Sequence, residues 1–131
     1  VACAAGIANF HILEREDICG RVREHGPYFQ KRMAELMELD AVGDVRGSHF
    51  MVCVETTADK KNKTVPPANW DFAWRIFEKC RPKGLLVRPL SHLVILSPPL
   101  VITRTQIDQA VETLRQGIKD VMDDLTREGL R

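Results

Sequence analysis

The sequence contains no apolar run long enough to span a membrane, no Cys-x-x-Cys pair and no excess of charge of either sign. The short apolar runs exclude a transmembrane helix, and the cysteine spacing indicates neither a zinc knuckle nor a redox dithiol. Nineteen Lys and Arg residues against 18 Asp and Glu residues leave a formal net charge of +1. This balance gives no reason to expect nucleic acid or an anionic membrane as a partner. His11 and His25 have no neighbour at metal-ligand spacing, so we predict no metal site.

The chain also lacks an initiating methionine, a signal-peptide pattern and any internal repeat. Val1 already stands inside a helical pattern, which we interpret as the start of a fragment of a longer polypeptide. The 131 residues are 44% hydrophobic and 28% charged, an ordinary composition for one soluble domain spanning residues 1–131. We expect the cysteines to be reduced, mostly buried thiols of a cytoplasmic protein; they are Cys3, Cys19, Cys53 and Cys80.

Hydrophobic periodicity predicts four helices. The first runs from Ala2 to about Glu16, and Asp17 caps a second that continues to about Leu39 with a kink or a one-turn break at Gly26-Pro27. A third begins after Pro66-Pro67 and carries the stripe Trp70, Ala73, Trp74, Phe77 and Cys80. The fourth follows the capping box Thr103 to Gln106 and should lie across a sheet; its stripe is Ile107, Val111, Leu114, Ile118, Val121, Met122 and Leu125.

Three apolar segments predict strands. Residues Phe50 to Glu55 alternate after a turn at Gly43, and both faces of this strand are largely apolar, which suits a central strand or one covered by a second body. Leu85 to Val87 and Leu93 to Leu96 are too short for helices and too apolar for exposed loops. Together with the helices they predict an α+β fold with a small antiparallel or mixed sheet of three to four strands. The lysine-rich stretch from Thr56 to Pro66 has no glycine-rich cradle, so we interpret it as a solvated loop.

Arg88 interrupts the apolar stretch from Gly84 to Leu100. At the end of a buried strand and stiffened by Pro89, its guanidinium must find an anion or lie in water. Its planar fork of donors suits a carboxylate in bidentate geometry. On the residues alone, an exposed arginine at a strand end remains the more common situation.

The same stretch, Gly-Leu-Leu-Val-Arg followed by a turn, an apolar strand and Pro-Pro-Leu, resembles the C-terminal signature of class III aminotransferases of the omega-amino acid and diamine type. Val1 to Ala5 resembles the helix after the family's Gly-His-Pro. Val45-Arg46-Gly47 and the strand to Glu55 resemble a further family motif, although His49 stands where the family usually has glycine. The three matches occur in the family's order and cover nearly the whole chain.

The resemblance implies the C-terminal small domain of a longer fold-type I enzyme that uses pyridoxal phosphate (PLP), with an amino donor, a keto acid acceptor, its own large domain and a second subunit as partners. It implies that Arg88 binds the substrate carboxylate and that Arg46 has a structural role. No catalytic or cofactor-binding residue is identified, because no lysine lies in an apolar strand-end setting that could support a Schiff base. We therefore expect the chain to be inactive alone and not to bind PLP. A non-catalytic α+β dimerisation or ligand-binding module remains the alternative.

Overall fold

A four-stranded sheet organises the computed structural model, which describes residues 1–131. The strands are β1 (Val42–Ser48), β2 (Met51–Thr56), β3 (Arg88–Leu90) and β4 (Leu93–Leu96). They stand in the order β1-β2-β4-β3, and every neighbouring pair is antiparallel. The structure therefore confirms the predicted α+β fold and selects the antiparallel form of the sheet.

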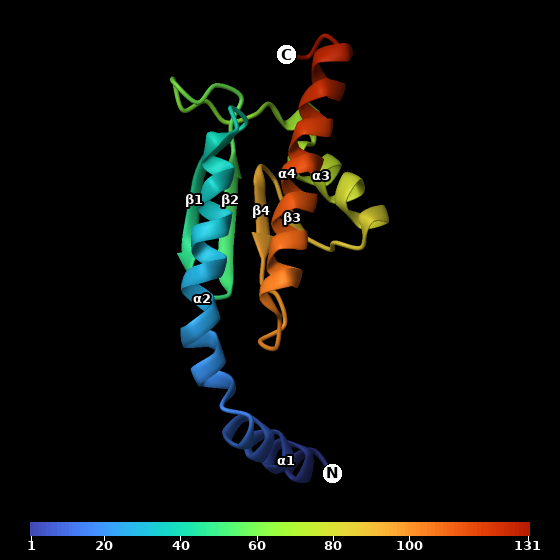
Figure 1. The fold of residues 1–131 in the computed structure, drawn as a ribbon. Coiled ribbons are helices and arrows are strands. Elements are labelled where there is room, and N and C mark those ends of the chain that lie inside the picture. Colours follow the sequence, from blue (N-terminus) through green and yellow to red (C-terminus); the bar gives the residue numbers. More distant parts are fainter.

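Four helices accompany the sheet: α1 (Ala2–Arg15), α2 (Ile18–Ala34), α3 (Phe72–Cys80) and α4 (Arg104–Arg127). Short 3-10 turns follow α2 at Glu35–Glu38, precede α3 at Ala68–Trp70 and follow α3 at Arg81–Lys83. Figure 1 shows α2 and α4 side by side in front of the sheet, α3 beside α4, and α1 projecting away from the rest. None of the helices is both long and apolar enough to cross a membrane.

One hydrophobic core lies between the helices and a single face of the sheet. The strands contribute Val52 and Val54 from β2 and Val94 from β4, all at most 1% exposed. The matching stripe of α4 is the predicted one except for half-buried Met122; its buried residues include Ile107, Val111, Leu114, Ile118, Val121 and Leu125. The Thr103 hydroxyl and the Gln106 side chain form the predicted reciprocal capping box, which satisfies amides at the start of this helix.

Strand β1 is the main element that the sequence patterns did not predict. The sequence pattern predicts a turn at Gly43 before the strand at Phe50, yet Gly43 lies inside β1, where the pairing with β2 shifts between Val42 and Asp44. Such an irregularity inserts an extra residue into one strand and breaks the alternation of side chains. The alternation of Phe50 to Glu55 itself is confirmed, with Val52 and Val54 buried and Met51 exposed.

The strand predicted at Leu85 to Val87 begins three residues later, so Arg88 opens β3 rather than closing a strand. Proline at the second position of β3 is compatible with a strand that has a partner on only one side. Of the kink or one-turn break expected at Gly26-Pro27, the break does not occur, because α2 runs without interruption through Pro27. That proline is exposed, so water can bind the carbonyl that has lost its helical donor.

Two further expectations about burial are wrong. Trp74 is 49% exposed, and the buried face of α3 is instead formed by Phe72, Ala73, Ile76 and Cys80. The cysteines are all free, as expected for reduced thiols, but only Cys80 is buried. Cys3 and Cys19 are exposed, and Cys53 is half-buried.

Candidate functional site

The helices leave one face of the sheet uncovered, and we call it the open face. Its members follow from the strand register, because residues paired across antiparallel strands point to the same side of the sheet. Met51 is 63% exposed and Leu90 is 50% exposed on this face, whereas Val52 and Val94 on the other face are buried. The open face consists of Asp44, Arg46, Ser48, Met51, Cys53, Glu55, Arg88, Leu90, Leu93 and Ile95.

Both arginines singled out in the sequence stand in one row across the open face. Arg46 of β1 pairs with Cys53, Cys53 pairs with Ile95, and Ile95 pairs with Arg88 of β3. Three strand spacings of about 4.8 Å separate the two arginine backbones, roughly 14 Å in total. The sheet thus brings together residues that are far apart in the sequence and leaves two half-buried side chains between the arginines.

Arg88 is exposed and has neither an ion pair nor a side-chain hydrogen bond within the chain. Its neighbours on the open face are apolar, with Ile95 directly opposite and Leu90 two residues along the same strand. A guanidinium in these surroundings has all its donors available, and a carboxylate can accept two of them in parallel. Arg88 is therefore the arginine on the open face that is free to bind an anion.

Arg46 is already paired. Its Nη1 donates to Glu55 Oε2 at 2.5 Å and to Asp44 Oδ2 at 2.9 Å. The hydrogen bond to Glu55, and then the one to Asp44, raise the pKa of the guanidinium. Glu55 also lies 3.8 Å from His92 Nε2, measured from its Oε1. This acidic neighbourhood holds Arg46 on the sheet surface, which agrees with the structural role expected for it.

Cys53 lies between the arginines and is not an activated nucleophile. Burial raises the pKa of its thiol, and the opposing influence of Arg46 is smaller. A thiol with a raised pKa carries less thiolate at neutral pH and is correspondingly less reactive. The open face therefore offers anion binding through Arg88 but no activated thiol.

His49 forms the tight connection between β1 and β2, where the family usually has glycine. Its φ of 48° lies in the left-handed region, which glycine enters without steric cost. Its carbonyl oxygen accepts a hydrogen bond of 2.7 Å from Gln30 Nε2 on α2, which fixes the turn against that helix. The structure thus shows why glycine suits this position and how a histidine is accommodated.

A groove of about 610 Å³ lies outside the open face, between residues 83–86 and 96–102, with α4 along one side. Leu86, 73% exposed, forms part of its rim. The groove contains neither Arg88 nor Arg46, so the sequence-predicted site residues lie outside it.

The sequence patterns missed the register that connects these residues, because β1 was not recognised as a strand. Val42 and Val45 carried a usable signal for this strand. Residues on one face of a regular strand are an even number of positions apart, so these two valines share a face only if an extra residue lies between them, as Gly43 allows. Glu55 as the partner of Arg46 follows from the same register.

Comparisons with known proteins agree with these features. The family model described as Aminotransferase class-III matches residues 1–118. Adenosylmethionine-8-amino-7-oxononanoate aminotransferase of Methanocaldococcus jannaschii is 36% identical over 118 residues, which are 90% of this chain and 26% of that protein. The crystal structure of an omega-transferase from Vibrio fluvialis JS17 is 30% identical with a TM-score of 0.91, covering 95% of this chain and 30% of that one.

A PLP-bound aminotransferase mutant from Vibrio fluvialis is also similar, with 30% identity and a TM-score of 0.89 over 93% of this chain and 27% of that one. The chain therefore spans between a quarter and a third of the length of these three proteins. Because the family model matches most of its length and solved aminotransferases share its fold, this chain belongs to the class III aminotransferase family.

Proposed function

We propose that residues 1–131 form the C-terminal small domain of a PLP-dependent class III transaminase and that Arg88 binds the carboxylate of the substrate. The observation that carries the proposal is the contrast between the two arginines of the open face. Arg46 is occupied by Glu55 and Asp44, whereas Arg88 has no acidic partner and stands among apolar side chains. A substrate carboxylate would supply the missing partner, and the apolar surroundings would strengthen the pair by excluding water.

The residues of this chain do not fit a PLP site by themselves. When bound, PLP acts as the electron sink in such enzymes, and it needs a Schiff-base lysine, an acid for its ring nitrogen and a phosphate cradle. Lys60 is bonded to the carbonyls of Met37 and Leu39, Lys79 to Asp124 and Lys83 to Asp120. The other lysines are exposed to solvent; they are Lys31, Lys61, Lys63 and Lys119.

We therefore assign the cofactor and the chemical step to a larger domain of the same polypeptide, and to this chain the gripping and orientation of the substrate. An amino donor and a keto acid acceptor would be the substrates of the whole enzyme. We further propose a homodimer in the cytoplasm. The exposed apolar side chains of α1 and of the open face support association with further protein, and the free cysteines suit a reducing compartment.

The test is Arg88→Ala in the complete enzyme. A charge-assisted bidentate pair contributes about 1.5 to 3 kcal/mol, so kcat/KM for a keto acid such as pyruvate should fall by roughly one to two decades. The half-reaction with a simple amine lacking a carboxylate should be nearly unchanged. Arg88→Lys should restore only part of the loss, because an ammonium keeps the charge and loses the fork.

Arg104→Ala is the matched control, since it removes another exposed arginine that lies over the Tyr28 ring rather than on the sheet. It should leave both half-reactions unchanged. Equal losses for amine and keto acid in Arg88→Ala, measured by single-turnover absorbance, would show that Arg88 is a structural residue. Sequencing the encoded polypeptide upstream of Val1 tests the domain assignment separately, through the presence of a Schiff-base lysine followed by Gly-His-Pro.

A further inference from the structure

The open face carries two acidic side chains, Asp44 and Glu55, which lie side by side because the two residues are paired between β1 and β2. Arg46 bonds to both of them, with its Nη1 2.5 Å from Glu55 Oε2 and 2.9 Å from Asp44 Oδ2. One guanidinium thus serves two carboxylates, so the three side chains together carry one more negative charge than positive. Arg46 is therefore the group that keeps both acids paired on this surface.

Glu55 is the nearer of the two acids to Arg88. It pairs with Leu93 of β4. Leu93 pairs in turn with Leu90, which is two residues from Arg88 on β3. Two strand spacings and one step of two residues place the backbones of Glu55 and Arg88 about 12 Å apart, a separation that the extended side chains of arginine and glutamate can close together. Asp44 lies one strand further from Arg88.

The surface between Glu55 and Arg88 holds no competing charge. The side chains of the open face in this region are Cys53, Leu90, Leu93 and Ile95. Charges attract each other more strongly near such an apolar surface than in bulk water. The imidazole of His92 is the other group close to Glu55, with Nε2 3.8 Å from Oε1, which is beyond hydrogen-bonding distance. Without Arg46, the one remaining arginine of the open face would be Arg88.

We propose that Arg46 is a positioning residue for substrate binding: by occupying Glu55, it keeps Arg88 free for the carboxylate of the substrate. Two carboxylates, one on the sheet and one on the substrate, compete for the same guanidinium, and Arg46 removes the first from the competition. Arg46 acts in this way without touching the substrate. The inference rests on the role proposed for Arg88 and assigns Arg46 a part in substrate selection beyond its structural role.

Arg46→Ala in the complete enzyme tests the competition. Glu55 should then pair with Arg88, so the KM for a keto acid such as pyruvate should rise about twofold to fivefold, the size expected for an exposed ion pair. The kcat at saturating keto acid should stay near the wild-type value, because the substrate displaces the internal carboxylate at high concentration. The half-reaction with an amine that lacks a carboxylate should be unchanged. Arg46→Met keeps the aliphatic stem of this half-exposed side chain and gives the same test if alanine destabilises the strand.

Glu55→Gln supplies the rescue that a merely structural role of Arg46 would not show. The amide keeps the shape of the side chain and removes its charge, so the KM should return to the wild-type value when Glu55→Gln is added to Arg46→Ala. A packing defect caused by Arg46→Ala would persist in this double variant. His92→Gln added to Arg46→Ala removes the other group near Glu55 and should leave the raised KM in place. Thermal unfolding followed by circular dichroism shows whether each variant is folded.

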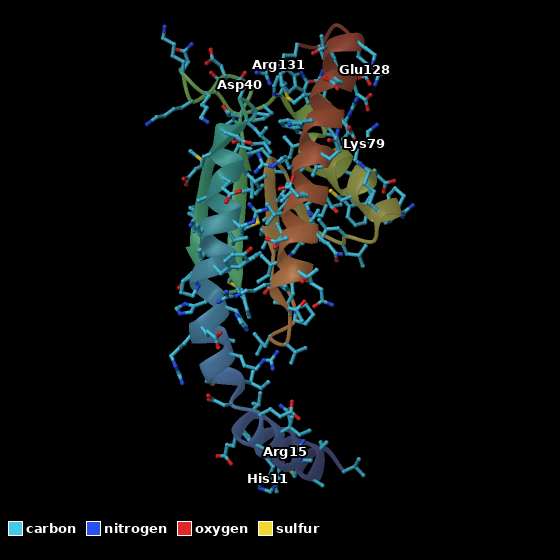
Figure 2. All side chains as sticks on the ribbon, viewed as in Figure 1. His11, Arg15, Asp40, Lys79, Glu128 and Arg131 are labelled. Carbon is cyan, nitrogen blue, oxygen red and sulfur yellow. The ribbon has the colours of Figure 1, made fainter.

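Two controls frame the experiment. Ile95→Glu places a carboxylate directly opposite Arg88 and should raise the KM for the keto acid at least about fivefold. Lys79→Ala removes a cation that lies 2.5 Å from Asp124, as close as Arg46 lies to Glu55. Figure 2 shows Lys79 on α3, away from β1 and β2, so this variant should leave both half-reactions unchanged.

An unchanged KM in Arg46→Ala and Arg46→Met would overturn the proposal, because Glu55 would then not reach Arg88 even when released. A raised KM that Glu55→Gln fails to lower would also overturn it, since the loss would come from packing rather than from competition. Both results leave the role of Arg88 intact, provided that Arg88→Ala loses the keto acid half-reaction selectively. Equal losses in both half-reactions of Arg88→Ala would instead refute that role itself.

Discussion

The contact between Gly117 and Cys80 allows a prediction in which one substitution reverses the effect of another. Gly117 lies on α4 against α3, and a Cβ added there would stand 2.7 Å from Cys80 Sγ. The next nearest atoms, Ile76 O and Lys79 Cβ, are 3.7 Å away, an ordinary contact distance. The sulfur atom is thus the single obstacle to a side chain at position 117.

The expected energies follow from this geometry. Overpacking a core costs about 1 to 3 kcal/mol, while replacing a helical glycine by alanine contributes about 1 kcal/mol in the opposite direction. Gly117→Ala should therefore lower the free energy of unfolding by up to about 2 kcal/mol. Cys80→Ala removes a fully buried sulfur and should cost about 1 to 2 kcal/mol through the small void that it leaves.

In the double variant the new methyl group occupies the space of the lost sulfur. We expect its stability to lie within about 1 kcal/mol of the wild type, with a favourable coupling of about 1 to 3 kcal/mol between the two sites. Urea denaturation followed by circular dichroism gives all four free energies of unfolding, provided that the m-values agree. Strictly additive losses would refute the reasoning, because they would mean that the sulfur is not what excludes a side chain at Gly117.

Four further predictions concern the chain alone. Hydrogen bonds from Lys79 and Arg75 lower the pKa values of Asp124 and Glu128 in the folded protein. The stabilising contribution of these two carboxylates should therefore be complete above their unfolded pKa values of 3.8 and 4.5 and should disappear as the pH falls through the folded values. Urea midpoints measured from pH 6 to 2.5 test this dependence, and Asp124→Asn should make the midpoint depend less on pH. His49→Gly should raise the urea midpoint by relieving about 1 kcal/mol of left-handed strain, and a lower midpoint would contradict this explanation of the turn. Titration with PLP should give no absorbance band that survives dialysis; a stoichiometric band would place a cofactor site within these residues. Sedimentation at increasing concentration should show self-association through exposed apolar side chains, and a monomer throughout would argue against it.

Local patterns were sufficient for the elements whose signals lie close together in the sequence. The stripe of α4 and its capping box needed only the residues Thr103 to Leu125, since both depend on contacts within one or two helical turns. The alternation of β2 and the apolar run of β4 were likewise readable, and the motif around Arg88 indicated the family. These features are determined by the chain's own sequence because their physical causes are local.

Only the tertiary structure decided which residues meet across the sheet. The row that contains Arg46, Cys53, Ile95 and Arg88 depends on a register set by the irregularity at Gly43 and by the order of four strands. A shift of one residue would turn every side chain to the opposite face. The exposure of Trp74 depends on how α3 packs against α4, and the pairing of Arg46 with Glu55 depends on the register of β1 with β2. That Arg46 is occupied while Arg88 is free is therefore a property of the folded sheet. Arg46 meets Glu55 through the register of β1 with β2, and Arg88 joins the same row only because β2 pairs with β4, which lies about forty residues later in the chain.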